Sequence, residues 1–325
     1  MKAIVTGGAG FIGSHMVELL LDKGFEVIAV DDMSNGQQEN IDLFKGNPNY
    51  KFYKIDLARK FDDSIFDVDY VFHMAALADI VPSIEEPLKY HNANVTGTIK
   101  VLEACRKYNI KKLVYTASSS CYGIPNKYPT LENADINPMY PYAFTKYIGE
   151  QYVLFWHKLY GIPVVSLRLF NVFGTRARTN NTYGAVFKVF LSQKLHNKPL
   201  TVVGDGTQTR DFTYVTDVVR AHLIAAESDV IGEVINIGTG KPQSINYLAK
   251  LIGGEVEFIP KRPGEPDSTH ADITKAKKLL NWEPEISFEE GVKIMLDNID
   301  YWKKSPLWDK ESIEKATKKW FEYLS

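Results

Sequence analysis

The chain has 325 residues, of which 45% are hydrophobic and 24% are charged, and its formal net charge is −2. This length and composition predict a globular protein of about two domains, or one large α/β unit with an elaborated end. The small net charge gives no reason to expect nucleic acid or an anionic membrane as a partner. No apolar run reaches the length of a membrane span, so we expect no transmembrane segment.

The chain contains two cysteines, Cys105 and Cys121. Such a low count is typical of reduced, structural thiols rather than of a disulfide framework. The first residues lead directly into a strand and a glycine loop, so we expect no signal peptide and a cytoplasmic location.

The first apolar run, residues 2–6, predicts a short strand, and a glycine-rich loop follows at once. Gly7, Gly10 and Gly13 have the spacing G-x-x-G-x-x-G, a variant of the dinucleotide-binding fingerprint. The first glycines permit a tight turn close to a pyrophosphate, and Gly13 lets the helix predicted over about 11–23 pack on the strand. The N–H groups at the start of this helix would point at the phosphates.

A second predicted strand, residues 26–30, ends in Asp31 and Asp32. An acidic residue about 20 positions after the glycines typically binds the ribose of the adenosine half, and it would repel a 2′-phosphate. The position of Asp31 therefore predicts NAD rather than NADP.

Two further strands are predicted at 51–55 and 70–76. The first ends in Asp56, next to the expected adenine, and the second ends in small residues that let a cofactor lie against the backbone. His73 falls within the second run, and we interpret it as a packed core histidine rather than a general base. A helix runs from after Pro87 to about Tyr108. The alternation of strands and helices predicts a parallel sheet that binds ligands at the carboxyl ends of its strands.

The chemistry is expected in the segment that follows. A buried strand predicted at 113–115 leads into a serine cluster that begins at Ser118, and Pro141 suits the first turn of a helix. Tyr142 and Lys146 are four residues apart, so they lie on one face of that helix. An ammonium beside a phenol lowers the phenol's pKa, and the phenolate can then take a proton from a sugar hydroxyl. A lone Tyr-x-x-x-Lys is more often an exposed helix face, and the preceding glycine loop favours the catalytic interpretation.

The second half of the chain continues the alternation. A strand is predicted at 163–170, and residues 175–183 form a polar loop that would face a substrate. Arg176 and Arg178 in this loop could meet phosphates, although solvated positions are the more common outcome. The remaining predicted elements are helices at 185–197, 216–228, 244–252, 273–281, 288–303 and 310–324, and strands at 200–203 and 234–238, the last returning to the main sheet.

No linker rich in Pro, Gly or Ser separates the two halves. We therefore expect interleaved domains, with residues 1–171 and about 215–242 binding the cofactor. Residues 172–214 and 243–325 would form the substrate domain.

These features together resemble the extended short-chain dehydrogenase/reductase family, in its nucleotide-sugar branch of 4-epimerases and 4,6-dehydratases. Further marks are Leu167-Arg168-Leu169-Phe170-Asn171, Arg210-Asp211-Phe212, and Arg262-Pro263-Gly264-Glu265 followed by Ala271-Asp272. The resemblance covers nearly the whole chain and ends before the tail that begins near Ser305. It implies a Rossmann-type, doubly wound parallel sheet with an interleaved, smaller C-terminal α/β substrate domain. It also implies a homodimer, paired through helices near 95–108 and 142–160.

The resemblance assigns the catalytic roles to Ser118, Tyr142 and Lys146. In the 4,6-dehydratases an Asp-Glu pair stands where this chain has Ser119 and Ser120, and a hydroxyl pair cannot replace carboxylates in an elimination. The chain therefore looks like a 4-epimerase. In such an enzyme Tyr142 takes the proton of the sugar 4-hydroxyl while C4 gives a hydride to NAD, and the 4-keto sugar turns over before the hydride returns.

The resemblance also implies the binding residues, and no metal. The cofactor contacts would be Gly7, Gly10, Phe11, Ile12, Gly13, Asp31, Asp32, Asn35, Asp56, Leu57, Ala75, Ala76, Asn94, Tyr142, Lys146 and Phe170. The contacts to the nucleotide-diphosphate sugar would be Ser119, Ser120, Asn171, Val186, Arg210, Arg262, Glu265 and Thr269. Ion pairs of Arg210 and Arg262 with Asp211 or Glu265 are the alternative to a grip on the diphosphate.

Thr269 stands five places after Gly264, where a tyrosine in related epimerases closes the pocket to an N-acetyl group. The smaller threonine predicts that acetylated UDP-sugars are accepted, unless it merely packs in a loop. Two alternatives remain for the whole chain. One is a 4,6-dehydratase or C4 dehydrogenase/reductase acting on a UDP-, GDP-, CDP- or dTDP-sugar. The other is a catalytically inactive NAD-binding protein.

Overall fold

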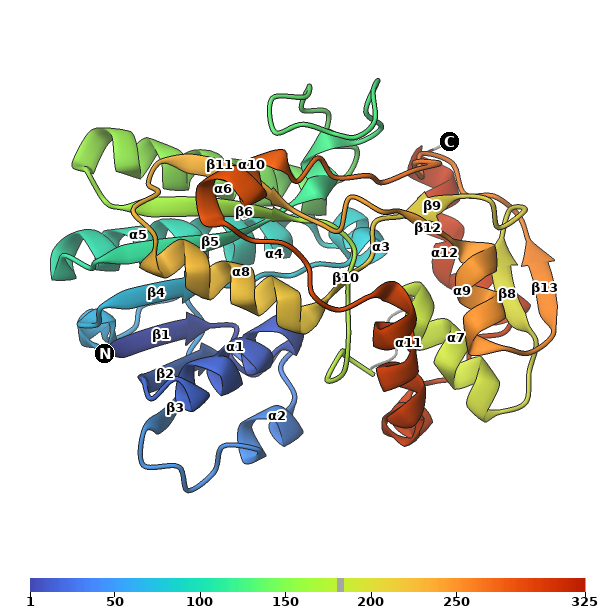
Figure 1. The fold of residues 1–325 in the computed structure, drawn as a ribbon, viewed down its shortest axis with the longest axis horizontal. Coiled ribbons are helices and arrows are strands. Elements are labelled where there is room, and N and C mark those ends of the chain that lie inside the picture. The colour runs from blue at the N-terminus through green and yellow to red at the C-terminus, as the bar shows by residue number, and fades with distance from the viewer. Residues whose placement is uncertain (180–183, 325) are drawn as a thin grey trace.

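The computed structural model describes residues 1–179 and 184–324, and a seven-stranded parallel sheet lies at its centre (Figure 1). The strand order is β11-β6-β5-β4-β1-β2-β3, and every neighbouring pair is parallel. The strands are β1 (Lys2–Thr6), β2 (Glu26–Asp31), β3 (Tyr50–Lys54), β4 (Tyr70–His73), β5 (Lys112–Ser118), β6 (Val164–Leu169) and β11 (Glu233–Ile237). This doubly wound α/β sheet confirms the predicted fold class, including the return of β11 to the sheet.

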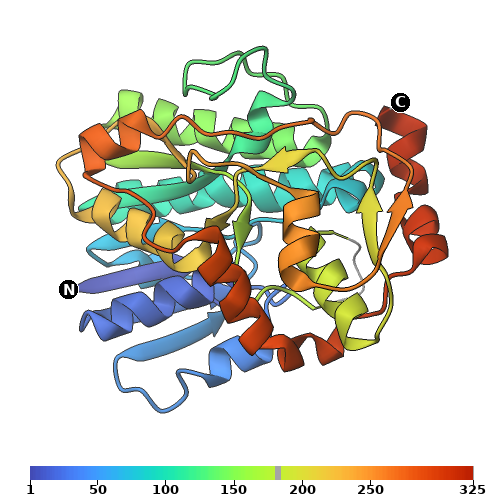
Figure 2. The same ribbon diagram turned by 45° about the vertical axis from the view of Figure 1, so that its right-hand side comes forward.

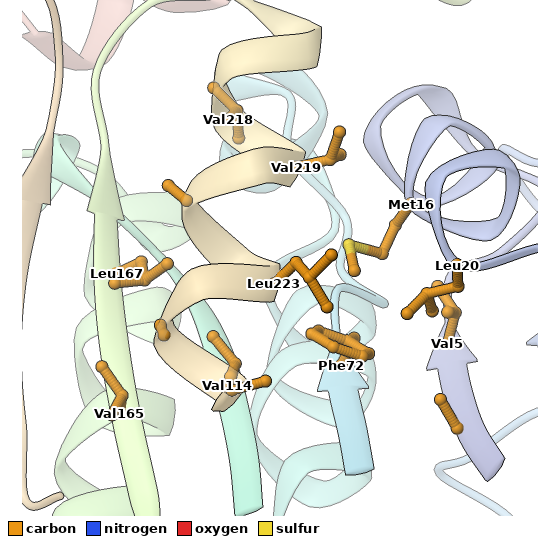
Figure 3. Close-up of a cluster of buried hydrophobic side chains, with 14 of the residues drawn as sticks. Val5, Met16, Leu20, Phe72, Val114, Val165, Leu167, Val218, Val219 and Leu223 are labelled. Carbon is orange, nitrogen blue, oxygen red and sulfur yellow. The ribbon is translucent and has the colours of Figure 1, made fainter. Parts of the chain in front are cut away.

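Helices cover both faces of this sheet because its strands are apolar on both sides. On one face lie α1 (Phe11–Asp22), α8 (Val215–Glu227) and α10 (Thr274–Leu280). Figure 3 shows the core on this face, where Leu223 of α8 and Met16 of α1 meet near Phe72 of β4. The other face is covered by α5 (Gly97–Tyr108) and α6 (Pro141–Tyr160).

In the first half of the chain, two predicted elements differ from the observed ones. The strand predicted at 70–76 ends at His73, because the Thr6 hydroxyl accepts hydrogen bonds from the N–H groups of Met74 and Ala75 and turns the chain away. The helix predicted after Pro87 is divided into α4 (Pro87–His91), a π-helical turn at Asn92–Thr96, and α5. Such turns occur most often at functional sites.

The smaller C-terminal part has its own core and three two-stranded sheets. The strand pairs are β7 (Val172–Phe173) with β10 (Thr213–Tyr214), β9 (Thr209–Arg210) with β12 (Gln243–Ser244), and β8 (Leu200–Val203) with β13 (Val256–Ile259). The core contains a cluster of aromatic rings. Phe212 stacks on Phe288 with 5.2 Å between the ring centres, and Phe187 stacks on Phe173 with 4.6 Å between the ring centres. Strand β13 was not predicted; three of its four residues are exposed, although Val256, Phe258 and Ile259 are apolar.

The remaining helices are α2 (Gln38–Asp42), α3 (Ile80–Glu85), α7 (Val186–Leu195), α9 (Ile245–Ile252), α11 (Phe288–Asp297) and α12 (Lys310–Leu324). The helix predicted at 288–303 is α11 followed by a separate 3₁₀ turn, Ile299–Lys304. Within the part of the chain that the structure describes, no helix is long and apolar enough to cross a membrane.

Candidate active site

A cavity of about 380 Å³ lies at the carboxyl ends of β1, β2 and β4, where the order of the sheet reverses. This is the position at which doubly wound sheets bind dinucleotides. Twelve predicted cofactor residues line it: Gly7, Gly10, Phe11, Ile12, Gly13, Asp31, Asp32, Asn35, Asp56, Leu57, Ala75 and Ala76. We call this cavity the cofactor groove.

The glycine loop leaves no room for side chains at the head of the groove. Gly7 has φ of +73°, and a Cβ there would lie 2.9 Å from the backbone of Ala75. A Cβ on Gly13 would lie 2.0 Å from the carbonyl oxygen of Gly7. The backbone is therefore bare where the pyrophosphate of NAD would sit, and the residues present fit that cofactor.

Asp31 is held in place at the end of β2. One carboxylate oxygen accepts a hydrogen bond from Ala9 N at 3.1 Å and the other from Met33 N at 2.9 Å. Burial raises the pKa of Asp31, and these two backbone bonds oppose the shift. The carboxylate lines the groove in a fixed orientation, as a ribose-binding group requires.

Four predicted cofactor residues do not line the groove: Asn94, Tyr142, Lys146 and Phe170. Asn94 lies on the π-helical turn, where its side chain bonds both backbone groups of Leu77 and the Thr145 hydroxyl. Leu77 itself lines the groove, so Asn94 shapes the wall from behind. Phe170 is buried against Tyr122.

Tyr142 and Lys146 lie on the first two turns of α6, which begins at Pro141 as predicted. Burial raises the pKa of the Tyr142 phenol, and a hydrogen bond with Ser118 opposes the shift. Burial lowers the pKa of Lys146 to about 7, and its ammonium lies 4.4 Å from the centre of the Tyr115 ring. The sequence predicted that Lys146 lowers the phenol's pKa. In the structure burial has the largest effect on Tyr142, and the net shift of its pKa is upward.

His73 is a core residue, as predicted. Its ring lies between the hydroxyls of Thr6, at 2.7 Å, and Thr98, at 2.9 Å. Burial lowers the pKa of His73 to about 3, so the ring is neutral and holds β4 in place.

The serine cluster forms a 3₁₀ turn at the end of β5, with Ser118 as its cap. The Ser118 hydroxyl lies 2.8 Å from that of Ser120 and accepts from Ser120 N at 3.2 Å. The turn needs Gly123, which has φ of +63° and whose Cβ would lie 2.1 Å from the carbonyl oxygen of Asn137. The serine cluster thus presents hydroxyl groups at the end of β5, and Ser118 bonds the Tyr142 phenol.

A buried ion pair supports the catalytic helix from behind. Arg168 of β6 donates to Glu150 of α6 at 2.6 Å, and also to the hydroxyl of Tyr122 at 2.9 Å. Glu150 lies one turn after Lys146 and raises the pKa of that lysine against the effect of burial. The sequence predicted no role for Glu150, because a lone glutamate in a helix gives no signal of burial.

Five of the eight predicted substrate residues lie in the C-terminal part, whereas Ser119, Ser120 and Asn171 belong to the first part of the chain. Thr269 donates to the side-chain oxygen of Asn171 at 2.6 Å, so these two residues do lie together. Arg210 pairs with Glu265 at 2.9 Å, and Arg262 lies 3.8 Å from the same carboxylate. Arg210 and Glu265 line a second cavity of about 420 Å³.

The sequence offered ion pairs of Arg210 and Arg262 as the alternative to diphosphate binding, and such pairs are present at Glu265. Asp211 makes none of them, since its carboxylate accepts backbone N–H groups of Thr239, Gly240 and Ala271. Val186 begins α7 and packs against the C-terminal core.

Arg176 and Arg178 are neither solvated nor free for phosphates. Arg176 pairs with Glu18 at 2.6 Å, and Arg178 pairs with Asp79 at 2.6 Å beside the cofactor groove. Residues 180–183 of the predicted loop lie outside the described residues. The groove also includes Lys188, whose pKa burial lowers to about 8. Nothing in the sequence marked Asp79 or Lys188, because the partners come from distant segments.

Within the described ranges, no group of three His, Cys, Asp or Glu side chains could hold a metal ion.

Comparisons with known proteins identify relatives of the whole chain. The model of the NAD dependent epimerase/dehydratase family matches residues 3–238. A putative UDP-glucose 4-epimerase of Methanocaldococcus jannaschii is 41% identical over 300 residues, which are 89% of this chain and 95% of the relative.

Two solved structures are similar as well. The UDP-N-acetylglucosamine 4-epimerase of Methanobrevibacter ruminantium M1, in complex with UDP-N-acetylmuramic acid, has a TM-score of 0.86 and 36% identity over 91% of this chain and 98% of that one. The UDP-glucuronic acid 4-epimerase of Bacillus cereus, in complex with UDP-glucuronic acid and NAD, has a TM-score of 0.86 and 35% identity. The match covers 92% of this chain and 99% of that one. These three relatives are described as 4-epimerases of different UDP-sugars, and UDP-glucuronic acid decarboxylases of Arabidopsis thaliana are similar as well, at 33% identity.

Proposed function

The chain belongs to the NAD-dependent epimerase/dehydratase family, and we propose that this NAD-dependent UDP-sugar 4-epimerase interconverts UDP-N-acetylglucosamine and UDP-N-acetylgalactosamine. The observation that carries the proposal is the group of hydroxyls around Tyr142. Ser118 bonds the phenol, while Ser119 and Ser120 stand where an elimination would need carboxylates. The small Thr269 beside Asn171 supports the choice of an acetylated sugar.

The proposed mechanism uses the chain's own groups for proton transfer. When bound, NAD supplies the hydride acceptor, and its cationic nicotinamide favours the phenolate form of a nearby tyrosine. The Tyr142 oxygen takes the proton of the sugar 4-hydroxyl as C4 becomes a carbonyl carbon. The Ser118 hydroxyl hydrogen-bonds the phenol oxygen. Lys146, whose pKa burial lowers to about 7, can donate a proton near neutral pH. The Tyr142 proton then returns to the same oxygen when C4 is reduced from its other face.

Arg210 and Arg262 are proposed to bind the diphosphate of the substrate. Each guanidinium offers several N–H donors in a planar fork, which matches phosphate oxygens. Both lie at Glu265, so one carboxylate serves two guanidinium groups.

The deciding experiment follows the stereochemistry at C4 by NMR. The NAD-loaded protein is incubated separately with UDP-glucose, UDP-N-acetylglucosamine and UDP-glucuronate. We expect the acetylated pair to equilibrate at least as fast as the others. Exclusive turnover of UDP-glucuronate would contradict the proposed substrate, and a 4-keto-6-deoxy product would contradict epimerisation itself. Accumulation of NADH would instead favour a C4 dehydrogenase.

We further propose the predicted domain division, a homodimer formed through α5 and α6, and a cytoplasmic location. The homodimer is supported by the exposed apolar face of α6, which includes Phe144, Phe155 and Leu159. The location is supported by Cys105 and Cys121, which are both buried free thiols.

A further inference from the structure

The C-terminal helix α12 has no part in the mechanism proposed above, yet it packs on the loop that carries Arg262. Trp320 of this helix is buried, and its indole N–H donates to the carbonyl oxygen of Pro263 at 2.7 Å. The guanidinium carbon of Arg262 lies 5.6 Å from the centre of the Trp320 ring, within cation–π range. A single tail residue therefore contacts both the backbone and the arginine of this loop.

The helix is anchored along its length. Asp309 and Ser312 cap its start by bonding each other's N–H groups, and Ile313, Thr317 and Trp320 form one buried face. At its far end, a Cβ on Gly264 would already lie 3.4 Å from Leu324. The position of Trp320 is thus fixed by the helix as a whole.

The helix also reaches the other side of the site. It packs against α3, which begins directly after the groove-lining Asp79. Figures 1 and 2 show α12, in red, beside α3. The tail thus bridges the wall of the cofactor groove and the Arg262 loop.

Arg262 also lies 3.8 Å from Glu265, the carboxylate that Arg210 holds at 2.9 Å. A stacked aromatic ring restricts the plane of a guanidinium without neutralising its charge. The Trp320 ring therefore helps to set the orientation of the Arg262 guanidinium.

We propose that Trp320 is a positioning residue that sets Arg262 for the diphosphate of the nucleotide sugar, so that α12 is part of the substrate-binding machinery. The inference rests on the proposed function for the nature of the ligand. Trp320 contacts none of the catalytic groups, and its effect on binding passes through Arg262 and the Pro263 backbone.

The test measures binding of UDP to the full-length, NAD-loaded protein by calorimetry, which needs no turnover. We expect Trp320→Leu to weaken UDP binding about tenfold, a loss within the range of a desolvated cation–π contact together with a hydrogen bond. Trp320→Phe keeps a ring over Arg262 and should recover part of the loss. Tyr323→Leu, which removes an exposed aromatic ring of the same helix, is the matched control and should leave UDP binding unchanged.

A double-mutant cycle with Arg262→Gln separates positioning from general destabilisation. If Trp320 acts through Arg262, then Trp320→Leu adds little to the loss already caused by Arg262→Gln. Fully additive losses, or unchanged UDP affinity in folded Trp320→Leu, would overturn the inference. Should Trp320→Leu fail to fold, the same cycle is run with Trp320→Phe.

Turnover gives a second measurement. Trp320→Leu should raise KM for the UDP-sugar more than it lowers kcat, because the sugar carbon and Tyr142 are untouched. Failure of the wild-type protein to bind UDP would count against the proposed function instead, so the two failures are distinguishable.

Discussion

Tyr142 is the only proposed proton acceptor of the sugar hydroxyl, and its ring packs without need of the phenolic oxygen. Tyr142→Phe should therefore reduce turnover to less than about a hundredth of the wild-type rate, since a general acid–base group contributes about 10²–10⁴-fold. Turnover is followed by NMR, and bound NAD is measured after denaturation. A variant that keeps its NAD and a rate above that limit would show that another group moves the proton.

Thr269 is proposed to leave space for the substituent at C2 of the sugar. Thr269→Tyr should remove activity on the acetylated UDP-sugars and spare UDP-glucose, because a filled pocket rejects only the substrate that needs the filled volume. Thr269→Ser is the control, since it keeps the hydroxyl that bonds Asn171 and accepts from Asp211 N. Equal losses on both classes of substrate would contradict the assignment.

Asp31 sets the expected choice between NAD and NADP. Its charge opposes a 2′-phosphate, so the purified protein should release NAD when denatured, as measured by chromatography. Asp31→Asn keeps an oxygen acceptor for the loop and removes the charge. The ratio of the affinity for NAD to the affinity for NADP should therefore fall about tenfold. An unchanged preference in this variant would mean that the backbone, not the carboxylate, selects the cofactor.

Helix α6 carries catalytic groups on one face and an exposed apolar stripe on another. Phe144, Phe155 and Leu159 are each more than half exposed. We expect Phe155→Asp to convert the proposed dimer into a monomer of 36.8 kDa, as measured by light scattering at micromolar concentration. Phe258→Asp, at an equally exposed position on β13, should leave the dimer intact. A monomeric wild-type protein would exclude this interface.

The same helix is tied to β6 through the buried pair of Glu150 and Arg168. Glu150→Gln leaves the Arg168 charge unpaired, so the free energy of unfolding should fall by about 3–5 kcal/mol. Urea unfolding measures this loss. Asp297→Asn breaks the exposed pair with Lys293 and should cost less than about 1 kcal/mol. Similar small losses in both variants would indicate that the buried pair adds little to stability.

Over the whole molecule, the sequence predicted the parts that depend on local pattern. The strands of the main sheet are short apolar runs, and the glycine spacing marks the groove, so both were found. No local pattern encodes contacts between distant segments. Arg178 pairs with Asp79, 99 residues before it, and Arg262 contacts Trp320, 58 residues after it. The raised pKa of Tyr142 depends on burial, which only the assembled fold determines.

Segments from the first and last parts of the chain also meet at the cofactor groove. The Tyr301 hydroxyl lies 3.1 Å from the side-chain oxygen of Gln37 and 3.0 Å from the carbonyl oxygen of Ala177, and Lys304 pairs with Glu39. These contacts close the groove with residues from the first and last parts of the sequence, and Trp302 itself lines it.

This arrangement has a consequence for the newly made protein. The glycine loop leaves the ribosome early, whereas Trp302 follows it by 295 residues, which takes roughly 15–60 s at the usual rate of translation. Strand β11, which completes the sheet, is also made late. During that interval the groove lacks the part of its lining that Trp302 supplies, so we expect the tightest retention of NAD in the finished chain.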